Sequence, residues 1–226
     1  MEKLNIFKLF LNRIYHLIFI ENFNKKLNIH FPPNIFRHNL IQYIIDKYNF
    51  LNYLEIGCDK NQTFSEINIK YKIGVDPISG GTIRDTSDNF FNNNSMKFDI
   101  IFIDGLHEYS QVIKDIHNSL NILNDDGFIL IHDCLPRTMA HQAVPRYRGS
   151  WNGDVWKAIV ELRTKKDLDI LTCQIDFGIA VIRKKENTKI LKLNINNFKN
   201  LKFKDYYYNH SEYMNIISYQ QTLELI

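Results

Sequence analysis

The stretch from residue 50 to 135 alternates short apolar runs with helix-like patterns, and this alternation constrains the fold more than any other feature. The clearest run, FDIIFID at 98–104, is β-branched and aromatic and ends in an acid. Runs at 53–57, 72–76 and 128–131 are also typical of buried strands. Strands that alternate with helices form a parallel sheet with helices on both faces. We therefore predict an α/β fold with a doubly wound, mostly parallel sheet.

The same patterns predict further elements along the chain. Helices are expected at 39–49, 63–67, 88–91, 109–123 and 153–163, and strands at 82–85, 168–172 and 178–183. Asp126 and Gly127 are expected to end the fourth of these helices before the next strand. We divide the chain into an N-terminal helical extension (1–37), a central domain (38–185) and a C-terminal extension (186–226).

The segment 4–20 is strongly apolar but does not predict a membrane-spanning helix. Four polar residues interrupt it: Lys8, Asn12, Arg13 and His16. At helical spacing one face carries Ile6, Phe10, Ile14, Leu17 and Ile18. We expect an amphipathic helix that caps the core or mediates homodimerisation, without stable membrane insertion; the alternative is a helix that lies on a membrane surface.

Charge and cysteine content narrow the class of protein. The net charge is only +3, from 28 basic and 25 acidic residues among 226. A nucleic-acid partner needs clustered positive charge, so none is expected. The three cysteines, Cys58, Cys134 and Cys173, are far apart and show no metal-binding or disulfide spacing. Reduced thiols and a cytoplasmic location are the expectation.

Polar residues and one glycine close the predicted strands, at the edge of the sheet where ligands bind. They are Glu55, Gly57, Asp76, Asp104, His132 and Asp133. Gly57 allows close backbone approach, and Asp76 follows about 20 residues later, the spacing of a carboxylate that binds ribose hydroxyls. The segment 57–63 has only one glycine and the chain has no P-loop. A nucleoside cofactor without phosphate is therefore favoured over NAD.

Several ordered motifs resemble one family. The runs YLEIGCDKNQTF, KIGVDP, DTSDNFF and FDIIFIDGLHEYSQVIKDIHNSLNILNDDGFILIHDCLP resemble class I S-adenosylmethionine methyltransferases, closest to sugar O-methyltransferases of the macrocin type. The resemblance covers about 38–183 and implies a Rossmann-like methyltransferase fold that binds S-adenosylmethionine. It also implies that Glu55 and Gly57 lie near the methionine end, Asp76 at the ribose, and Ser87 and Asp88 near the adenine, and Asp104 is expected to contact the cofactor as well.

A hydroxyl acceptor needs a base, and His is the side chain that titrates closest to neutral pH. His107 follows Asp104 by three residues, and in metal-dependent members of the family these positions hold a base and a Mg²⁺ ligand. The resemblance places two more ligands at His132 and Asp133. Asp133 suits Mg²⁺, whereas His132 suits a metal that accepts imidazole. The alternative is that no metal binds and His107 and His132 act alone.

We therefore expect methyl transfer from S-adenosylmethionine to a hydroxyl of a sugar or other small molecule, with His107 as general base. Arg146 and Arg148 lie in the long connection 136–153 and could meet a sugar phosphate. WNGDVW, at 151–156, is expected to pack near the site. An NAD-dependent oxidoreductase and a non-catalytic nucleoside-binding scaffold are the alternatives.

Overall fold

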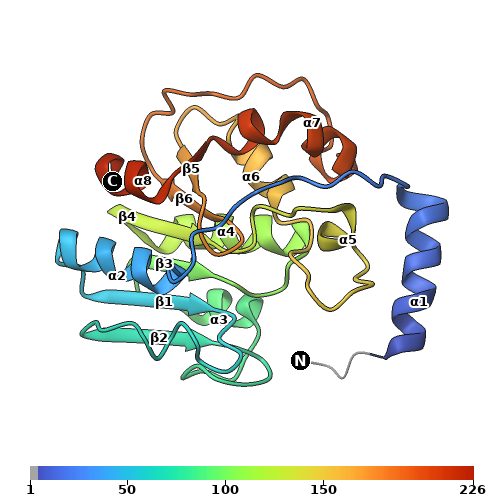
Figure 1. Ribbon diagram of the computed structural model, residues 1–226. Helices are drawn as coiled ribbons and strands as arrows, with labels where there is room; N and C mark the ends of the chain where they lie inside the picture. Colours follow the sequence, from blue (N-terminus) through green and yellow to red (C-terminus); the bar gives the residue numbers. More distant parts are fainter. Residues whose placement is uncertain (1–4) are drawn as a thin grey trace.

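The computed structural model describes residues 5–226 and centres on a seven-stranded sheet with helices on both faces (Figure 1). The strands are β1 (Asn52–Ile56), β2 (Tyr71–Val75), β3 (Phe98–Ile103), β4 (Leu123–Ile131), β5 (Asp169–Cys173), β6 (Ile179–Arg183) and β7 (Ile216–Ile217). The α-helices are α1 (Ile6–Tyr15), α2 (Arg37–Tyr48), α3 (Ser87–Asn93), α4 (Tyr109–Ile122), α5 (Met139–Gln142), α6 (Trp156–Leu162), α7 (Phe203–Met214) and α8 (Tyr219–Leu225). A π-helical segment η1 (His16–Ile20) and a 3₁₀ turn η2 (Phe198–Asn200) complete them. Residues 1–4 of the predicted N-terminal extension, and with them the first residue of its predicted helix, lie outside the described residues.

The strand order is β2-β1-β3-β4-β6-β5-β7, and only β6 runs against its neighbours. The predicted α/β fold with a doubly wound, mostly parallel sheet is confirmed. The chain moves outward from β1 to β2 and then returns to the other side of β1 with β3. This reversal separates the connections that follow β1 and β3, and it creates a crevice beyond their carboxyl ends.

The core explains why the strands are apolar along their whole length. On β3, Ile101 and Ile103 pack into one buried cluster, while Ile100 and Phe102 pack into the other. Successive side chains point to opposite faces of a sheet. Because helices cover both faces, both sets of side chains are buried, and the strand needs a continuous apolar sequence.

Two predicted elements near β2 are wrong. The segment expected as a helix at 63–67 forms turns between residues 59 and 66. Asp59 and Asn61 begin these turns with left-handed backbone angles (φ 43° and 61°), and the amide of Glu66 then donates to the carbonyl of Thr63, three residues back and not four as in an α-helix. The strand expected at 82–85 is reduced to a single bridge between Ile83 and Val75.

Two helix boundaries also differ from the prediction. The helix expected from 153 begins at Trp156, because Gly153 has a positive φ of 64° and a turn precedes the helix. Helix α4 ends at Ile122 and β4 follows without a gap, so β4 includes Asp126 and Gly127. Pairing of Leu123 with Phe98 on β3 accounts for the early start of β4.

The N-terminal amphipathic helix forms as α1, but it does not cap the core. It lies at the margin of the molecule, and none of its residues is buried (Figure 1). Ile6, Phe10 and Ile14 are 83%, 57% and 39% exposed. The expected cap on the core is therefore wrong, whereas homodimerisation through this helix stays a prediction. Among the described helices, none combines the length and the apolar character needed to span a bilayer.

The C-terminal segment 186–226 joins the central domain. Strand β7 pairs with β5 at the edge of the sheet. On α7, the ring of Tyr206 lies 4.8 Å from that of Trp156 on α6. All three cysteines are buried and free, as expected for reduced thiols.

The buried position of Ile101 gives a test of this core. Replacing Ile101, which is fully buried on β3, by alanine should lower the free energy of unfolding by about 2–5 kcal/mol, because the lost side chain leaves a cavity. Ile6→Ala removes the same atoms from an 83% exposed site and should change stability by less than about 0.5 kcal/mol. Urea unfolding measures both, and equal losses would contradict this packing.

Candidate active site

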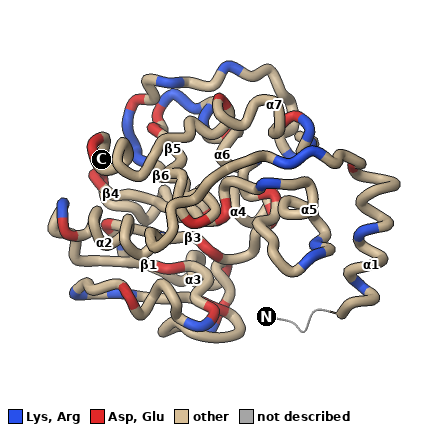
Figure 2. The backbone as a smooth tube through the Cα atoms, viewed as in Figure 1, with Lys and Arg blue, Asp and Glu red and all other residues tan. Residues whose placement is uncertain are grey.

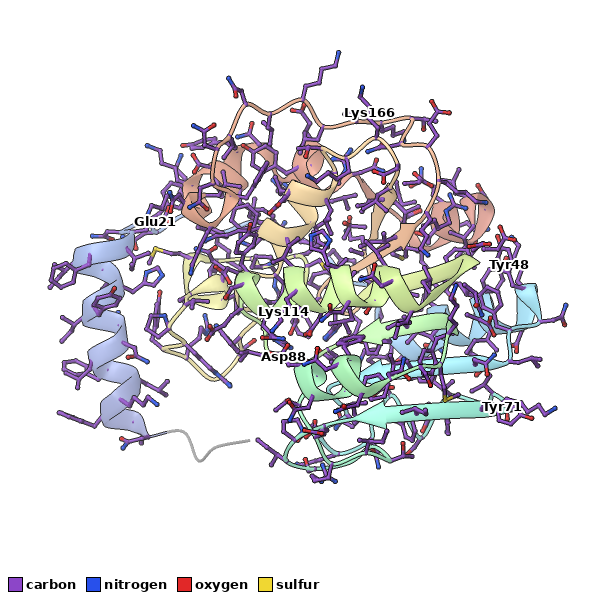
Figure 3. The ribbon with its side chains drawn as sticks, turned by 180° about the vertical axis from the view of Figure 1, so that it is seen from behind. Glu21, Tyr48, Tyr71, Asp88, Lys114 and Lys166 are labelled. Atoms are coloured by element: carbon purple, nitrogen blue, oxygen red, sulfur yellow. The ribbon has the colours of Figure 1, made fainter. Side chains whose placement is uncertain are left out.

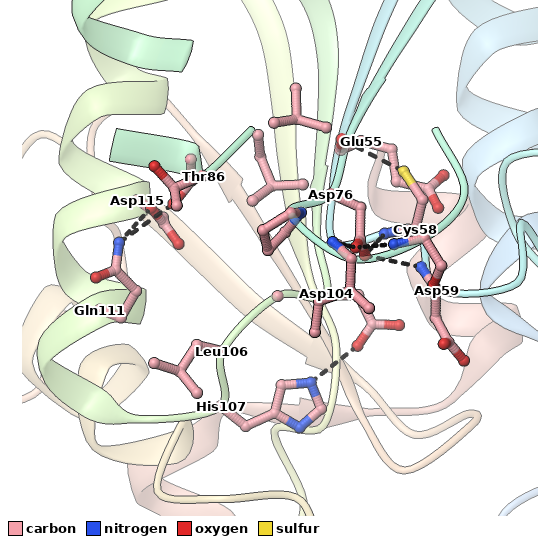
Figure 4. A pocket seen from close by; sticks show the side chains of 18 of the residues that line it. Glu55, Cys58, Asp59, Asp76, Thr86, Asp104, Leu106, His107, Gln111 and Asp115 are labelled. Carbon is pink, nitrogen blue, oxygen red and sulfur yellow. Dashed lines mark hydrogen bonds and ion pairs between the residues drawn. The ribbon is translucent and has the colours of Figure 1, made fainter. Parts of the chain in front are cut away.

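A cavity of about 710 Å³ lies beyond the carboxyl ends of β1, β2 and β3 (Figure 4). Seven predicted site residues line it: Glu55, Gly57, Asp76, Ser87, Asp88, Asp104 and His107. His132 and Asp133 do not line it, and they lie directly behind Asp104 and His107. The parallel strands therefore bring the predicted residues to one edge of the sheet, as the sequence indicated.

Gly57 makes the tight turn after β1. Its φ is +87°, and a Cβ atom there would lie 2.3 Å from the carbonyl oxygen of Asp104. Only glycine allows the ends of β1 and β3 to approach so closely. The turn therefore brings the chain at the end of β1 directly against the backbone of Asp104.

Both carboxylate oxygens of Asp76 accept hydrogen bonds from backbone amides. One oxygen accepts hydrogen bonds from the amides of Cys58 (3.0 Å) and Asp59 (2.9 Å), and the other from Ile78 (2.7 Å) and Ser79 (2.8 Å) (Figure 4). Burial raises its pKa, but these four donors outweigh burial and the net shift is downward. A carboxylate offers about four lone-pair sites. A ribose hydroxyl could therefore bind Asp76 only by sharing or replacing one of these bonds.

Glu55 lies at the floor of the cavity and is almost fully buried. Tyr53 donates a hydrogen bond of 2.5 Å to its carboxyl group. Burial raises the pKa of Glu55 to about 8, even though the Tyr53 hydroxyl favours the charged form. Without a ligand, the carboxyl group is therefore mainly protonated at neutral pH, and a cationic ligand group would favour its ionisation.

Ser87 and Asp88 stand at the start of α3, at another part of the cavity lining. The side-chain amide of Gln111 on α4 lies within hydrogen-bond distance of both, at 3.2 and 3.1 Å. The same amide donates to Asp115 at 2.9 Å, and Lys114 forms an ion pair with Asp88. These contacts join α3 to α4 and present several polar atoms to a ligand.

Asp104, His107 and Asp133 form a compact cluster, and one ligand atom from each lies within 4.8 Å of the others. The His107 Nε2 atom is 3.2 Å from Asp104, and its Nδ1 atom is 3.0 Å from Asp133. Burial lowers the pKa of His107, but the two carboxylates outweigh burial and raise it to about 10. In the absence of another cation, His107 is therefore a charged imidazolium.

His132 lies behind this cluster, and both of its ring nitrogens face oxygen atoms. Nδ1 is 3.0 Å from Asp104, and Nε2 is 2.8 Å from the carbonyl oxygen of Asp176. Burial lowers the pKa of His132, but the charges of Asp104 and Asp133 raise it well above the usual value. Arg37, on α2, adds a third, partly buried cation through an ion pair of 2.9 Å with Asp176.

The segment 151–154 holds the cluster in place. Trp151 stacks on the His107 ring at 5.5 Å, and Asn152 donates a hydrogen bond of 2.8 Å to the carboxylate of Asp133. Asp154 accepts a 2.6 Å bond from the amide of Tyr109 at the start of α4. The sequence indicated packing here, but it did not identify these contacts. The motif WNGDVW was the available signal, whereas nothing in the sequence pointed to Arg37 or Asp176.

The comparisons with known proteins agree with this geometry. A methyltransferase domain family matches residues 12–134, more than half of the chain, and the chain belongs to this family. The membership favours methyl transfer over nicotinamide-dependent oxidoreduction and over a non-catalytic scaffold. No curated protein matches the chain.

Two solved structures share the fold at low sequence identity. Cofactor-bound Rv0187 from MTB superposes with a TM-score of 0.52 and 9% identity, over 80% of this chain and 90% of that one. A Klebsiella pneumoniae protein, provisionally described as an O-methyltransferase, gives a TM-score of 0.51 and 11% identity, over 80% and 89% of the two chains. At this identity the likeness establishes the fold alone.

The raised pKa of Glu55 predicts a pH-dependent stability. The folded chain binds the Glu55 proton up to a pKa of about 8, whereas the unfolded chain releases it near the ordinary value of 4.5. Between these values the folded chain holds the proton and the unfolded chain does not. The free energy of unfolding therefore falls as the pH rises, by up to about 1.4 kcal/mol per pH unit. Glu55→Gln keeps an acceptor for Tyr53 and should lose less stability between about pH 5 and about pH 8. Urea unfolding of both proteins measures the difference, and identical pH profiles would contradict it.

Gly153 gives a test of the 151–154 segment. An added Cβ would lie 1.7 Å from the His107 carbonyl oxygen, and the φ of +64° disfavours any other residue. Gly153→Ala should lower stability by about 1–3 kcal/mol and displace His107. Gly149→Ala is the matched control, because nothing lies within 4 Å of its added Cβ. Thermal unfolding that is equal for the two variants would rule out this contact.

Proposed function

We propose that this protein transfers the methyl group of S-adenosylmethionine to a hydroxyl group of a sugar or other small molecule, in the cytoplasm. The observation that carries the proposal is that one cavity contains both the residues expected to hold the cofactor and Asp104 and His107 of the buried cluster. Membership of a methyltransferase family supports the reaction type. The three free, buried cysteines fit a reducing compartment.

The lining suits a nucleoside that lacks phosphate. Its first turn has a single glycine, Gly57, and no glycine-rich phosphate cradle follows. Glu55 offers a buried carboxyl group to a cationic end, and Ser87 and Asp88 offer polar atoms at another part of the cavity. Asp76 orients the two backbone turns at 57–59 and 77–79. The cofactor supplies a methyl group already activated by a sulfonium, so the chain has to orient the acceptor and remove its proton.

Asp104 and Asp133 fit a divalent cation, since both are carboxylates and face each other across His107. His132 was predicted as a third ligand, and we now assign it to positioning Asp104. Nδ1 faces Asp104 and Nε2 faces the carbonyl oxygen of Asp176, with the Arg37 guanidinium 3.3 Å from Nε2, and the raised pKa of His132 keeps the ring protonated. A protonated ring has no lone pair for a metal. A bound cation would supply Lewis acidity that lowers the pKa of an acceptor hydroxyl.

His107 is the proposed base. Its pKa of about 10 depends on the negative charges of Asp104 and Asp133. Positive charge placed on these carboxylates weakens their hold on the proton and lowers the pKa of His107. The imidazole is then neutral, and it can accept the proton of the acceptor hydroxyl. His107 can therefore act as a base only when Asp104 and Asp133 hold a positive charge.

The acceptor end of the cavity includes Trp151 and Arg146. The Arg146 guanidinium lies 5.4 Å from the centre of the Trp151 ring, and that ring stacks on His107. An aromatic face next to a guanidinium suits a sugar, and the positive charge suits a phosphate group on it. This arrangement supports a sugar or sugar phosphate as the acceptor class.

Calorimetry with S-adenosylhomocysteine tests the cofactor half. Wild-type protein should bind it, and Asp76→Ala should weaken binding at least about tenfold because the four backbone bonds to Asp76 are lost. Asp167→Ala removes an exposed carboxylate outside the cavity and should leave binding unchanged. Absence of binding by the wild-type protein would refute the proposal.

Variants at the cluster separate the base from the metal ligands. His107→Ala should retain Mn²⁺ binding, measured by calorimetry. It should slow the formation of S-adenosylhomocysteine from S-adenosylmethionine, with a panel of sugars as acceptors, by about 10²-fold or more. Asp133→Asn should weaken Mn²⁺ binding as well as turnover. His117→Ala, at an exposed position on α4, is the control. Loss of Mn²⁺ binding in His107→Ala would make His107 a ligand, and normal turnover in that variant would exclude it as the base.

A further inference from the structure

Helix α1 is attached to the rest of the molecule by its polar face. The Asn12 side-chain amide donates a hydrogen bond of 2.8 Å to the carbonyl oxygen of Arg146. One turn further along, His16 is 99% buried, and its ring packs edge-on against Tyr147 at 5.4 Å. In an amphipathic helix on a globular protein the apolar face normally covers the core. Here Asn12 and His16 make these contacts, with Leu17 partly buried against the core, while the other large apolar side chains face solvent.

The apolar face of α1 and η1 is consequently exposed to solvent. The large side chains on it range from 39% to 83% exposed: Ile6, Phe7, Phe10, Leu11, Ile14, Tyr15, Ile18 and Phe19. Figure 1 shows the helix standing beside the α/β domain. A contiguous apolar surface of this kind marks a site of interaction.

The charges around this face indicate the partner. The only charged residues of segment 5–20 are Lys8 and Arg13, and both are basic (Figure 2). Both side chains are on the exposed helix, and Lys8 and Arg13 are themselves exposed. Glu21, the next acid, is occupied by the backbone amides of residues 203 and 204.

These charges distinguish between two partners for the apolar face, a second copy of α1 and an anionic lipid surface. Pairing of two copies of α1 would bring Lys8 and Arg13 of both chains together, without a carboxylate on either helix to compensate. An anionic lipid surface offers phosphates to the same basic residues and an apolar layer to the aromatic and aliphatic side chains. Basic residues beside an aromatic, apolar helix face are typical of helices that lie in the membrane interface.

We propose that the apolar face of α1 and η1 docks on an anionic lipid surface, with the helix lying in the plane of the interface. The polar contacts of Asn12 and His16 join this helix to the loop that carries Arg146 and Trp151, which line the cavity. Lipid contact through α1 therefore holds the active-site end of the protein near the surface. This inference is independent of the proposed methyl transfer.

Sedimentation of the full chain with vesicles tests the docking. The protein should bind vesicles of phosphatidylcholine mixed with phosphatidylglycerol, bind phosphatidylcholine alone more weakly, and dissociate as salt is added. Leu11→Asp should weaken binding at least about tenfold, because an apolar side chain at the interface is replaced by a charge. Leu51→Asp is the matched control, since Leu51 is 49% exposed and Leu11 is 48% exposed, and Leu51 precedes β1 at the opposite end of the strand from the cavity.

A second pair of variants tests the charge. Lys8→Gln should weaken binding to the anionic vesicles, whereas Lys166→Gln, at an exposed site away from α1, should not (Figure 3). No binding to anionic vesicles by the wild-type chain would overturn the proposal. So would equal effects of Leu11→Asp and Leu51→Asp. A concentration-dependent dimer in sedimentation velocity that Leu11→Asp dissociates, without lipid binding, would assign the face to a second copy of the chain.

Discussion

The carboxylate of Asp104 is the point on which the geometry of the site depends. It is held at the end of β3, next to the turn at Gly57, and three basic side chains approach it: Arg37, His107 and His132. A buried carboxylate is tolerated only where opposite charges compensate the loss of water. Burial raises the pKa of Asp104, and the two histidines outweigh burial and lower it. The charge balance therefore ties α2, β3 and β4 together at the floor of the cavity.

The same charge balance sets the protonation of His107. His107 lies between Asp104 and Asp133, and their charges keep its proton in place. Asn152 donates to Asp133, and Trp151 covers the imidazole, so the ring cannot turn away from the carboxylates without breaking contacts. The 151–154 segment, far from the cluster in sequence, supplies that rigidity.

The N-terminal helix packs on the domain in a different way from the rest of the chain. Elsewhere, apolar periodicity identifies the face that packs on the core, as it does on α4, where Val112 and Ile116 are buried. On α1 the apolar face is exposed, and Asn12 and His16 make the contacts to the domain. A helix that exposes its apolar side in this way is stabilised fully only when a partner covers it. The loop that receives these contacts also lines the cavity, which links the surface to the site.

The sequence alone determined the sheet, its parallel strands and the positions of Gly57, Asp76, Asp104 and His107 at one edge. These follow from local patterns, because parallel strands that end in polar residues must present them together. The left-handed backbone angles near Asp59 and the outward orientation of the apolar face of α1 could not be predicted from the sequence. Local periodicity shows that a helix is amphipathic, but not which of its faces packs against the domain.

Only the tertiary structure decided the contacts between distant segments. Arg37 reaches Asp176, which is 139 residues away, and Asn152 reaches Asp133 across a loop. The proposed roles of His107 and His132 also differ only through packing, because each imidazole takes its charge from the carboxylates and carbonyl oxygens around it. Residue type identifies a group that can change its charge. The surrounding dipoles and charges, which the folded chain brings together, set the charge that it carries.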